Sequence, residues 1–178
     1  MIRVATLNDV RFIETLIGDS VHGLQANDYD LNQRTGALGT VFGVDRQMIA
    51  DGTYFVIEVE GRVAACGGWS ARRTPFGGDR SPQKDDSMLD PATDAARIRA
   101  FFVHPDWARR GLGRQLYDAC ERAASTAGFR SFELMATLPG VPLYRALGFT
   151  DVERVTLTLS DDVAMPFVRM SRRIEPRE

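Results

Sequence analysis

The chain is organised around residues 103–114, which read Val103-His104-Pro105-Asp106-Trp107-Ala108-Arg109-Arg110-Gly111-Leu112-Gly113-Arg114. The apolar run at residues 98–103 contains aromatic and β-branched side chains, which predicts a buried strand. After the turn, apolar residues recur at helical spacing and predict a helix with one apolar face, namely Leu112, Leu116, Cys120, Ala123 and Ala127. Between strand and helix, Gly111 and Gly113 let the backbone turn tightly and approach a ligand closely.

A helix that begins at this turn is suited to bind an anion. Its first N–H groups have no partner within the helix, and the helix dipole places a partial positive charge at the same end. Both features favour a phosphate or pyrophosphate, and Arg109, Arg110 and Arg114 add full positive charges beside it. The stretch therefore predicts a site for a phosphorylated cofactor.

The composition is that of one ordinary globular domain. The chain has 178 residues, of which 44% are hydrophobic and 26% charged, so we expect a single domain over residues 1–178. A net charge of −2 argues against a nucleic-acid partner, and no apolar run is long enough to span a membrane. The only cysteines, Cys66 and Cys120, lack metal or redox spacing. We therefore expect reduced buried thiols, no metal, no membrane partner and a cytoplasmic location.

The first half of the chain predicts a strand, then helices, then a β-hairpin. We expect a strand at residues 2–5, a helix capped by Thr6 and Asp9, and one or two short helices within residues 21–50. A hairpin follows, with arms at residues 53–59 and 63–69. Residues 71–94 are rich in Pro, Gly and Asp and form a loop that is long for a compact domain. Two interpretations stay open for this loop, a mobile surface connection and a flap over an acceptor site.

The second half completes a sheet. The helix after Gly113 is expected to end at Gly128, and a strand at 132–136, a short helix at 141–147 and a hairpin at 152–159 and 164–171 follow. The polar tail at 172–178 is expected to fray. The order β-α-α-β-β-β-α-β-α-β-β predicts an α/β (α+β) fold, a mixed sheet of about seven strands with helices packed on it.

The segment Pro142-Leu143-Tyr144-Arg145-Ala146-Leu147-Gly148-Phe149, the turn at 103–114 and the order of elements together resemble the GCN5-related N-acetyltransferases. The resemblance is specific from Ala95 to Phe149. The family's turn motif reads Gln/Arg-x-x-Gly-x-Gly/Ala, and its backbone N–H groups hold the pyrophosphate of acetyl-coenzyme A (acetyl-CoA). Gly111 and Gly113 match this motif, whereas Ala108 does not. The resemblance implies a mostly antiparallel sheet that is splayed at the cofactor site and carries helices on both faces.

The resemblance also implies which residues contact acetyl-CoA. The strand before the turn pairs through its backbone with the pantetheine arm in the family, and Thr137 stands where the family often has Asn. The expected cofactor-binding residues are Phe101, Phe102, Val103, Arg109, Arg110, Gly111, Leu112, Gly113, Arg114 and Thr137.

Tyr144 is the expected catalytic residue. The family places a tyrosine at the start of the last helix, where its hydroxyl faces the coenzyme sulfur and can protonate the departing thiolate. A tyrosine pKa of about 10 against about 8.5 for a thiol makes full proton transfer uphill by about 2 kcal/mol. A hydrogen bond to the thiolate, or a lowered tyrosine pKa, would offset this cost. The alternative is that Tyr144 only packs beside Phe149.

The implied activity is direct transfer of an acetyl group from acetyl-CoA to an amine of a small molecule or a protein. Many family members carry a glutamate base four residues before the position of Val103, and this chain has Arg99 there. The difference hints at an acceptor amine of low pKa or at deprotonation through water. Arg99 could hold an acceptor carboxylate or form a salt bridge at the sheet surface, and Trp69 could line the same site or simply pack. A homodimer is left open.

Two other functions share parts of this sequence pattern. A dinucleotide-binding domain shares the strand-Gly-x-Gly-helix pattern, but Leu116 occupies its third glycine position and Glu133 lies inside a predicted strand. A catalytically degenerate acyl-CoA-binding or regulatory module stays open, because Ala108 and Arg99 depart from the family pattern.

Overall fold

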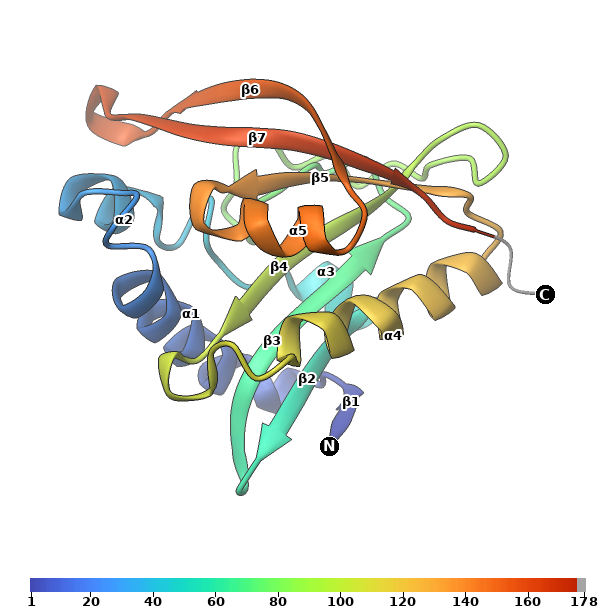
Figure 1. The fold of residues 1–178 in the computed structure, drawn as a ribbon, viewed down its shortest axis with the longest axis horizontal. Coiled ribbons are helices and arrows are strands. Elements are labelled where there is room, and N and C mark those ends of the chain that lie inside the picture. The colour runs from blue at the N-terminus through green and yellow to red at the C-terminus, as the bar shows by residue number, and fades with distance from the viewer. Residues whose placement is uncertain (176–178) are drawn as a thin grey trace.

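The computed structural model describes residues 1–175 and contains one seven-stranded sheet with the order β1-β2-β3-β4-β5-β7-β6 (Figure 1). The strands are β1 (Ile2–Val4), β2 (Tyr54–Val59), β3 (Arg62–Ser70), β4 (Ala96–Val103), β5 (Ser131–Thr137), β6 (Thr150–Thr158) and β7 (Ala164–Arg173). The helices are α1 (Val10–Leu24), α2 (Leu31–Ala37), α3 (Arg46–Ala50), α4 (Leu112–Thr126) and α5 (Val141–Ala146). All neighbouring strands are antiparallel except β4 and β5, so the predicted mixed, mostly antiparallel sheet is confirmed.

The sheet opens between its two parallel strands. β4 and β5 pair only at Ala96 with Phe132 and at Arg97 with Glu133. Beyond these residues β4 continues on β3, whereas β5 pairs with β7 from Ser131 to Thr137, and the two strands diverge in Figure 1. The predicted splay is therefore confirmed, and it exposes one backbone edge of β4 to the space between the strands.

A bulge in β4 shapes this opening. The register between β3 and β4 shifts between Cys66 and Gly68, opposite Ala100, whose φ of +57° lies in the left-handed region. The ring of Phe101 then lies directly over Gly67, where an added Cβ would come within 2.3 Å of it. Bulges twist a strand and redirect its side chains. The bulge thus turns the second half of β4 at the place where β5 leaves it.

Helices cover both faces of the sheet, as predicted. α1 buries Ile13, Ile17 and Val21 in a core that includes Val56 of β2. α4 packs on the opposite face, where Leu116 meets Ile57, the next residue of the same strand. Neighbouring residues of a strand point to opposite faces, so one strand supplies both cores. Figure 1 shows α4 in front of the sheet and α1 behind it.

The end of the chain differs from the sequence expectation. β7 continues to Arg173, and Arg172 donates from Nη1 to the Tyr117 hydroxyl of α4 at 2.7 Å while its guanidinium stacks on that ring. The prediction of a frayed tail beginning at residue 172 is therefore wrong for residues 172–173, because a contact with a distant helix holds them. Residues 176–178 of that predicted tail lie outside the described residues.

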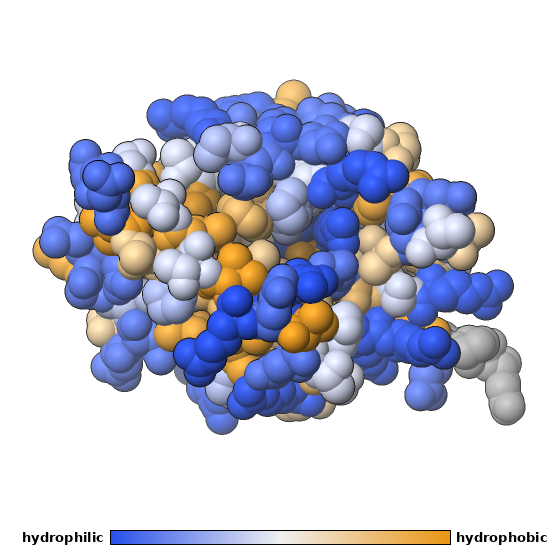
Figure 2. Space-filling view, turned by 90° about the horizontal axis from the view of Figure 1, so that it is seen from above, coloured by the Kyte–Doolittle hydropathy of each residue, from blue (hydrophilic) through white to orange (hydrophobic). Residues whose placement is uncertain are grey.

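The prediction of two buried thiols is confirmed. Both Cys66 and Cys120 are free and buried. The face in Figure 2 is largely hydrophilic, with smaller hydrophobic areas between the charged side chains. Within residues 1–175, no helix has the length and apolar character needed to cross a membrane.

Candidate active site

The start of α4 forms the turn that the sequence predicts, and its two glycines have different roles. Gly111 is the N-cap residue with φ of +80°, a conformation that favours glycine, and an added Cβ there would meet nothing within 4 Å. Gly113 instead allows close packing, because an added Cβ would lie 2.8 Å from the side chain of Leu143 on α5. The turn therefore keeps open space over Gly111 and brings α5 against α4.

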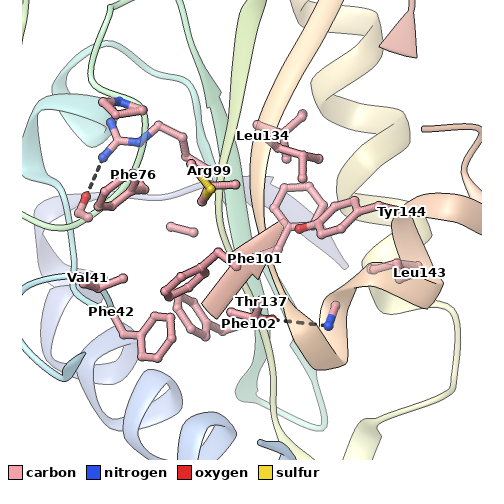
Figure 3. A pocket seen from close by; sticks show the side chains of 18 of the residues that line it. Val41, Phe42, Phe76, Arg99, Phe101, Phe102, Leu134, Thr137, Leu143 and Tyr144 are labelled. Carbon is pink, nitrogen blue, oxygen red and sulfur yellow. Dashed lines mark hydrogen bonds between the residues drawn. The ribbon is translucent and has the colours of Figure 1, made fainter. Parts of the chain in front are cut away.

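A pocket of about 130 Å³ occupies the opening between β4 and β5 (Figure 3). It runs from the start of α4 and from α5 to the segments at residues 41–42 and 75–77. Of the residues predicted from sequence, the pocket is lined by Arg99, Phe101, Phe102, Val103, Gly113, Thr137 and Tyr144. The other predicted cofactor residues, Arg109, Arg110, Gly111, Leu112 and Arg114, lie on the turn and the first residues of α4, next to Gly113.

Tyr144 extends from α5 into this pocket (Figure 3). Its ring lies 6.2 Å from that of Phe101 and 5.7 Å from that of Phe149, and its side chain is buried. Tyr144 thus packs beside Phe149 and also lines the pocket. Burial raises the pKa of Tyr144 well above its usual value, and the nearby Cys120 acts in the same direction. The sequence-based suggestion of a lowered tyrosine pKa is therefore wrong, and hydrogen-bond donation by the neutral hydroxyl is the option that fits.

Thr137 ends β5 and caps the short turn that leads to α5. Its Oγ1 accepts a hydrogen bond from the Gly140 N–H at 3.2 Å, so its own hydroxyl proton can still be donated. The next residue, Leu138, donates its N–H to the Tyr29 hydroxyl at 2.9 Å, and that hydroxyl donates to the Pro166 carbonyl of β7 at 2.7 Å. Burial raises the pKa of Tyr29 to about 12. Tyr29 thus ties the ends of β5 and β7 together, a role that no local sequence signal indicates.

Arg99 is an anchor for the pocket wall. Its Nη1 donates to Asp45 Oδ2 at 2.8 Å. Its Nη2 donates to the Gly77 carbonyl, the bond drawn at Arg99 in Figure 3. Both side chains of the Arg99–Asp45 pair are 2% exposed, and Lys84 Nζ lies 2.9 Å from the other carboxylate oxygen. Burial alone would raise the pKa of Asp45, but the hydrogen bonds and charges of Lys84 and Arg99 hold it below its usual range. The salt-bridge alternative for Arg99 is correct, but the pair is buried and not at the sheet surface.

Trp69 does not belong to the pocket. Its ring lies 5.8 Å from that of Phe129, and the side chain is part of the core between the sheet and α4. The expectation that Trp69 contacts the acceptor is therefore corrected to a packing role. Side-chain alternation on β3 sends Trp69 to the α4 face, whereas Arg99 points to the opposite face.

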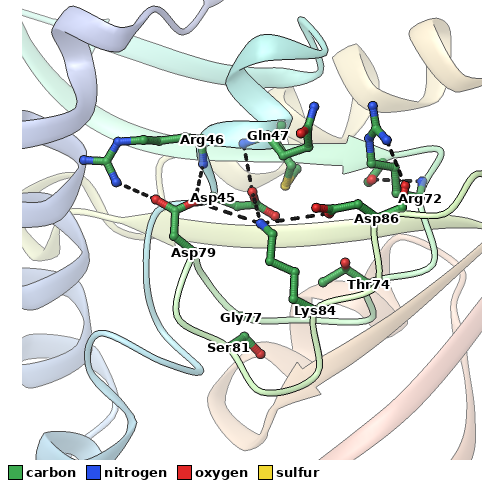
Figure 4. Close-up of polar contacts among 12 residues, drawn as sticks. Asp45, Arg46, Gln47, Arg72, Thr74, Gly77, Asp79, Ser81, Lys84 and Asp86 are labelled. Carbon is green, nitrogen blue, oxygen red and sulfur yellow. Dashed lines mark hydrogen bonds and ion pairs between the residues drawn. The ribbon is translucent and has the colours of Figure 1, made fainter.

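The long loop at residues 71–94 forms a wall of the pocket through Pro75, Phe76 and Gly77. Its backbone bonds to the segment that precedes α3, with the Gly78 N–H on the Thr40 carbonyl and the Asp79 N–H on the Val44 carbonyl. Ion pairs add to these bonds. Figure 4 shows those of Arg46 with Asp79 and of Lys84 with Asp45, and Arg72 pairs with Asp51. These contacts favour the interpretation of the loop as a cover over the pocket.

The lining of the pocket limits the acid–base chemistry available. Among the described residues that line it, none is Asp, Glu, His or Lys, and Arg99 carries the only formal charge. Within residues 1–175, no cluster of three or more His, Cys, Asp or Glu side chains could hold a metal ion. An amine that reacts in this pocket would lose its proton to water and not to a carboxylate in contact with it.

Comparisons with known proteins agree with this geometry. The family model described as the acetyltransferase (GNAT) family matches residues 25–149. A search of curated proteins found no match. Solved structures share the fold over nearly the whole chain. A GCN5-related N-acetyltransferase from Rhodopseudomonas palustris has a TM-score of 0.72 at 18% identity, covering 97% of this chain and 94% of that one.

Two further structures match at similar coverage. The PaiA N-acetyltransferase from Thermoplasma acidophilum, in complex with coenzyme A, has a TM-score of 0.65 at 10% identity, covering 97% of this chain and 98% of that one. The ribosomal-protein-alanine N-acetyltransferase from Brucella melitensis has a TM-score of 0.63 at 18% identity, covering 97% and 99%. At these identities the similarity concerns the fold.

Proposed function

The chain belongs to the acetyltransferase (GNAT) family, and from that premise we propose that acetyl transfer takes place in the pocket between β4 and β5, with Tyr144 as the catalytic residue. The family assignment makes the protein an acetyl-CoA-dependent N-acetyltransferase that acts on an amine. One observation carries the proposal: the pocket joins the open turn of α4 to Tyr144 through the divergence of two strands.

The residues at this opening fit acetyl-CoA. The N–H groups at the start of α4, with Arg109, Arg110 and Arg114 nearby, suit the pyrophosphate. The free edge of β4 at residues 101–103 offers backbone donors and acceptors to the amide groups of the pantetheine arm. Thr137 supplies a hydroxyl at the inner end of the same channel. Acetyl-CoA, when bound, supplies the acetyl group as a thioester.

Tyr144 acts on the leaving group. Its neutral hydroxyl donates a hydrogen bond to the sulfur as the C–S bond breaks and the acceptor nitrogen forms the new amide bond. Because its pKa is raised, the tyrosine stabilises the thiolate by hydrogen bonding, and the proton lost by the amine passes to water. The transfer is direct. Cys66 and Cys120 are buried, and burial raises the pKa of each thiol, which opposes their use as nucleophiles.

We further propose that residues 1–178 act as one domain in the cytoplasm, without a nucleic-acid or membrane partner. The slightly acidic net charge and the continuous sheet support this. Whether two copies associate is a question for light scattering or analytical ultracentrifugation.

The experiment has two arms. Calorimetry measures coenzyme A binding, and a thiol assay measures the release of free coenzyme A from acetyl-CoA in the presence of a mixed panel of primary amines. Binding together with amine-dependent release supports the proposal. Binding without release for any amine would leave a coenzyme A-binding module, and absence of binding would overturn the assignment of the pocket.

A further inference from the structure

We propose that the acceptor is a compact primary amine that bears an aromatic or branched apolar group and no carboxylate. The inference rests on the proposed function, since it concerns the part of the same pocket that lies beyond Tyr144. Three features of that part support it: the chemistry of its walls, the neutralisation of its one charge, and its closure by neighbouring segments.

The walls are apolar and aromatic. Phe42 is the central residue, because its ring lies 5.8 Å from that of Phe102 on β4 and 6.4 Å from that of Phe167 on β7. The remaining side chains of this part of the pocket are Val41, Pro75, Phe76 and Met135. Such a surface favours an apolar group, at about 25 cal/mol per Å² of apolar surface removed from water. Aromatic walls also add favourable edge contacts to an aromatic ligand.

The charge of the one charged residue in the lining is already paired, although its buried Nε has no hydrogen-bond partner. Both terminal nitrogens of Arg99 are engaged, one by Asp45 and the other by the Gly77 carbonyl. Asp45 in turn accepts from Lys84. A carboxylate on the acceptor would therefore enter an apolar site whose one cation already forms a buried ion pair with Asp45. Only the buried Nε–H of Arg99 would be left for it, and burying a charge without a full partner is costly. The same reasoning disfavours a second ammonium group, because the described lining contains no carboxylate.

Contacts tie α2 and the residues before it to the hairpin of β6 and β7, whose Phe167 lines the pocket. The side chain of Gln33 donates to the Ala164 carbonyl at 2.9 Å, and Tyr29 donates to the Pro166 carbonyl at 2.7 Å. Leu159, in the turn between β6 and β7, is buried against Gly36 of α2, and Figure 1 shows this turn above α2. The loop at residues 71–94 forms another wall of the pocket. An extended peptide would need a groove through these contacts, whereas a small molecule would not.

The absence of a carboxylate base agrees with such an acceptor. An ammonium group that enters an apolar pocket loses hydration without gaining an ion pair, so the neutral amine is the form that binds. The neutral amine is also the form that attacks a thioester. Because the pocket is apolar, it therefore binds the neutral amine, which is the reactive form.

A panel of acceptors tests the inference with the full chain and acetyl-CoA. The panel contains 2-phenylethylamine, 3-methylbutylamine, phenylalanine, spermidine and a short peptide with an N-terminal alanine. We expect kcat/KM to be at least about 30-fold higher for the first two amines than for the other three, which is within the discrimination an apolar pocket provides. A peptide, spermidine or phenylalanine as the best acceptor would overturn the inference but leave the proposed function intact.

Matched variants test whether the apolar walls of the pocket determine which amine is acetylated. Phe76→Ala should raise KM for 2-phenylethylamine about tenfold with little change in coenzyme A affinity. Val41→Glu should lower kcat/KM for 2-phenylethylamine and raise it for spermidine, because it places a carboxylate in the wall. Phe12→Ala, whose side chain is 49% exposed on α1, is the control and should change neither. If coenzyme A binds but neither apolar amine is acetylated, the inference is wrong; if coenzyme A does not bind, the proposed function fails first.

Discussion

Arg99 on β4 and Asp45 before α3 are 54 residues apart in the sequence, yet Nη1 and Oδ2 meet at 2.8 Å in a buried ion pair. Arg99 stands where many members of the family carry a catalytic glutamate. In this chain Arg99 holds the wall of the pocket in place, because its guanidinium also donates to the Gly77 carbonyl of the covering loop. The residue at that position is therefore a structural anchor in this chain.

Removing one partner of this pair should be strongly destabilising. Arg99→Met leaves Asp45 buried with Lys84 and the Gln47 N–H as partners of its other oxygen, and we expect a loss of about 2 to 4 kcal/mol in the free energy of unfolding. The double variant Arg99→Met with Asp45→Leu should recover part of that loss. Arg46→Met is the control, because it breaks a partly exposed pair and should cost less than about 1 kcal/mol. Urea denaturation measures all three, and equal losses for Arg99→Met and Arg46→Met would contradict the buried role.

Changes at the α4 turn should affect coenzyme binding. Gly111→Asp places a negative charge in the open space over the turn and should weaken coenzyme A binding by more than about tenfold. Gly111→Ala is the matched control. It carries the same backbone strain, about 1 kcal/mol from its positive φ, but no charge, and should bind coenzyme A nearly normally. Calorimetry compares the two variants, and an unchanged coenzyme A affinity for Gly111→Asp would exclude this turn as the pyrophosphate site.

Tyr144→Phe should separate chemistry from binding. Loss of the hydroxyl removes a hydrogen bond to the departing sulfur, so kcat should fall about 10-fold to 100-fold. The ring keeps its contacts with Phe101 and Phe149, so coenzyme A affinity and stability should stay close to those of the natural chain. Steady-state kinetics with calorimetry checks this, and an unchanged kcat would exclude Tyr144 from the mechanism.

The pH dependence of the rate should follow the acceptor and not the enzyme. Because no carboxylate, histidine or lysine is among the described lining residues, kcat/KM should rise with pH until the pKa of the free amine is passed. The raised pKa of Tyr144 keeps its hydroxyl protonated throughout this range. Two amines of similar shape and different pKa should therefore give profiles displaced by the difference between their pKa values. A common inflection near neutral pH for both would point to an enzyme base.

Asp9 should contribute to stability in a pH-dependent manner. Its carboxylate accepts two hydrogen bonds from Arg3, each of 2.8 Å, and these bonds lower its pKa from 3.8 to about 2. A carboxylate with a lowered pKa in the folded state stabilises above its unfolded pKa, and the contribution disappears as the pH falls through about 2. Asp9→Asn should thus cost about 1 to 2 kcal/mol at neutral pH and about half as much near pH 3. Asp28→Asn, at an exposed site, serves as the control, and a pH-independent cost for Asp9→Asn would refute the assignment.

The strands, the turn at α4 and the family could be predicted from the sequence, because these depend on local signals. The predicted order has two helices between the first two strands, where the structure has α1, α2 and α3. Gly111 with its positive φ, the strand–turn–helix pattern around it and the tyrosine at the start of α5 can each be recognised from a few neighbouring residues. The helical spacing of apolar residues likewise predicted the apolar face of α4. The boundaries were less certain, as β7 shows, since Arg172 is held by Tyr117 from another element.

The arrangement of side chains on the acceptor side of the pocket could be seen only in the folded chain. Gly113 is needed because Leu143 packs on it, Trp69 faces the α4 core, and Arg99 is paired with Asp45. Each of these facts depends on a contact between residues that are tens of positions apart in the sequence. Each also depends on the face of the sheet to which the side chains of a bulged strand point. A local pattern carries no information about such contacts, so the sequence indicated the donor of the acetyl group, and the folded chain indicates the chemistry of the amine that receives it.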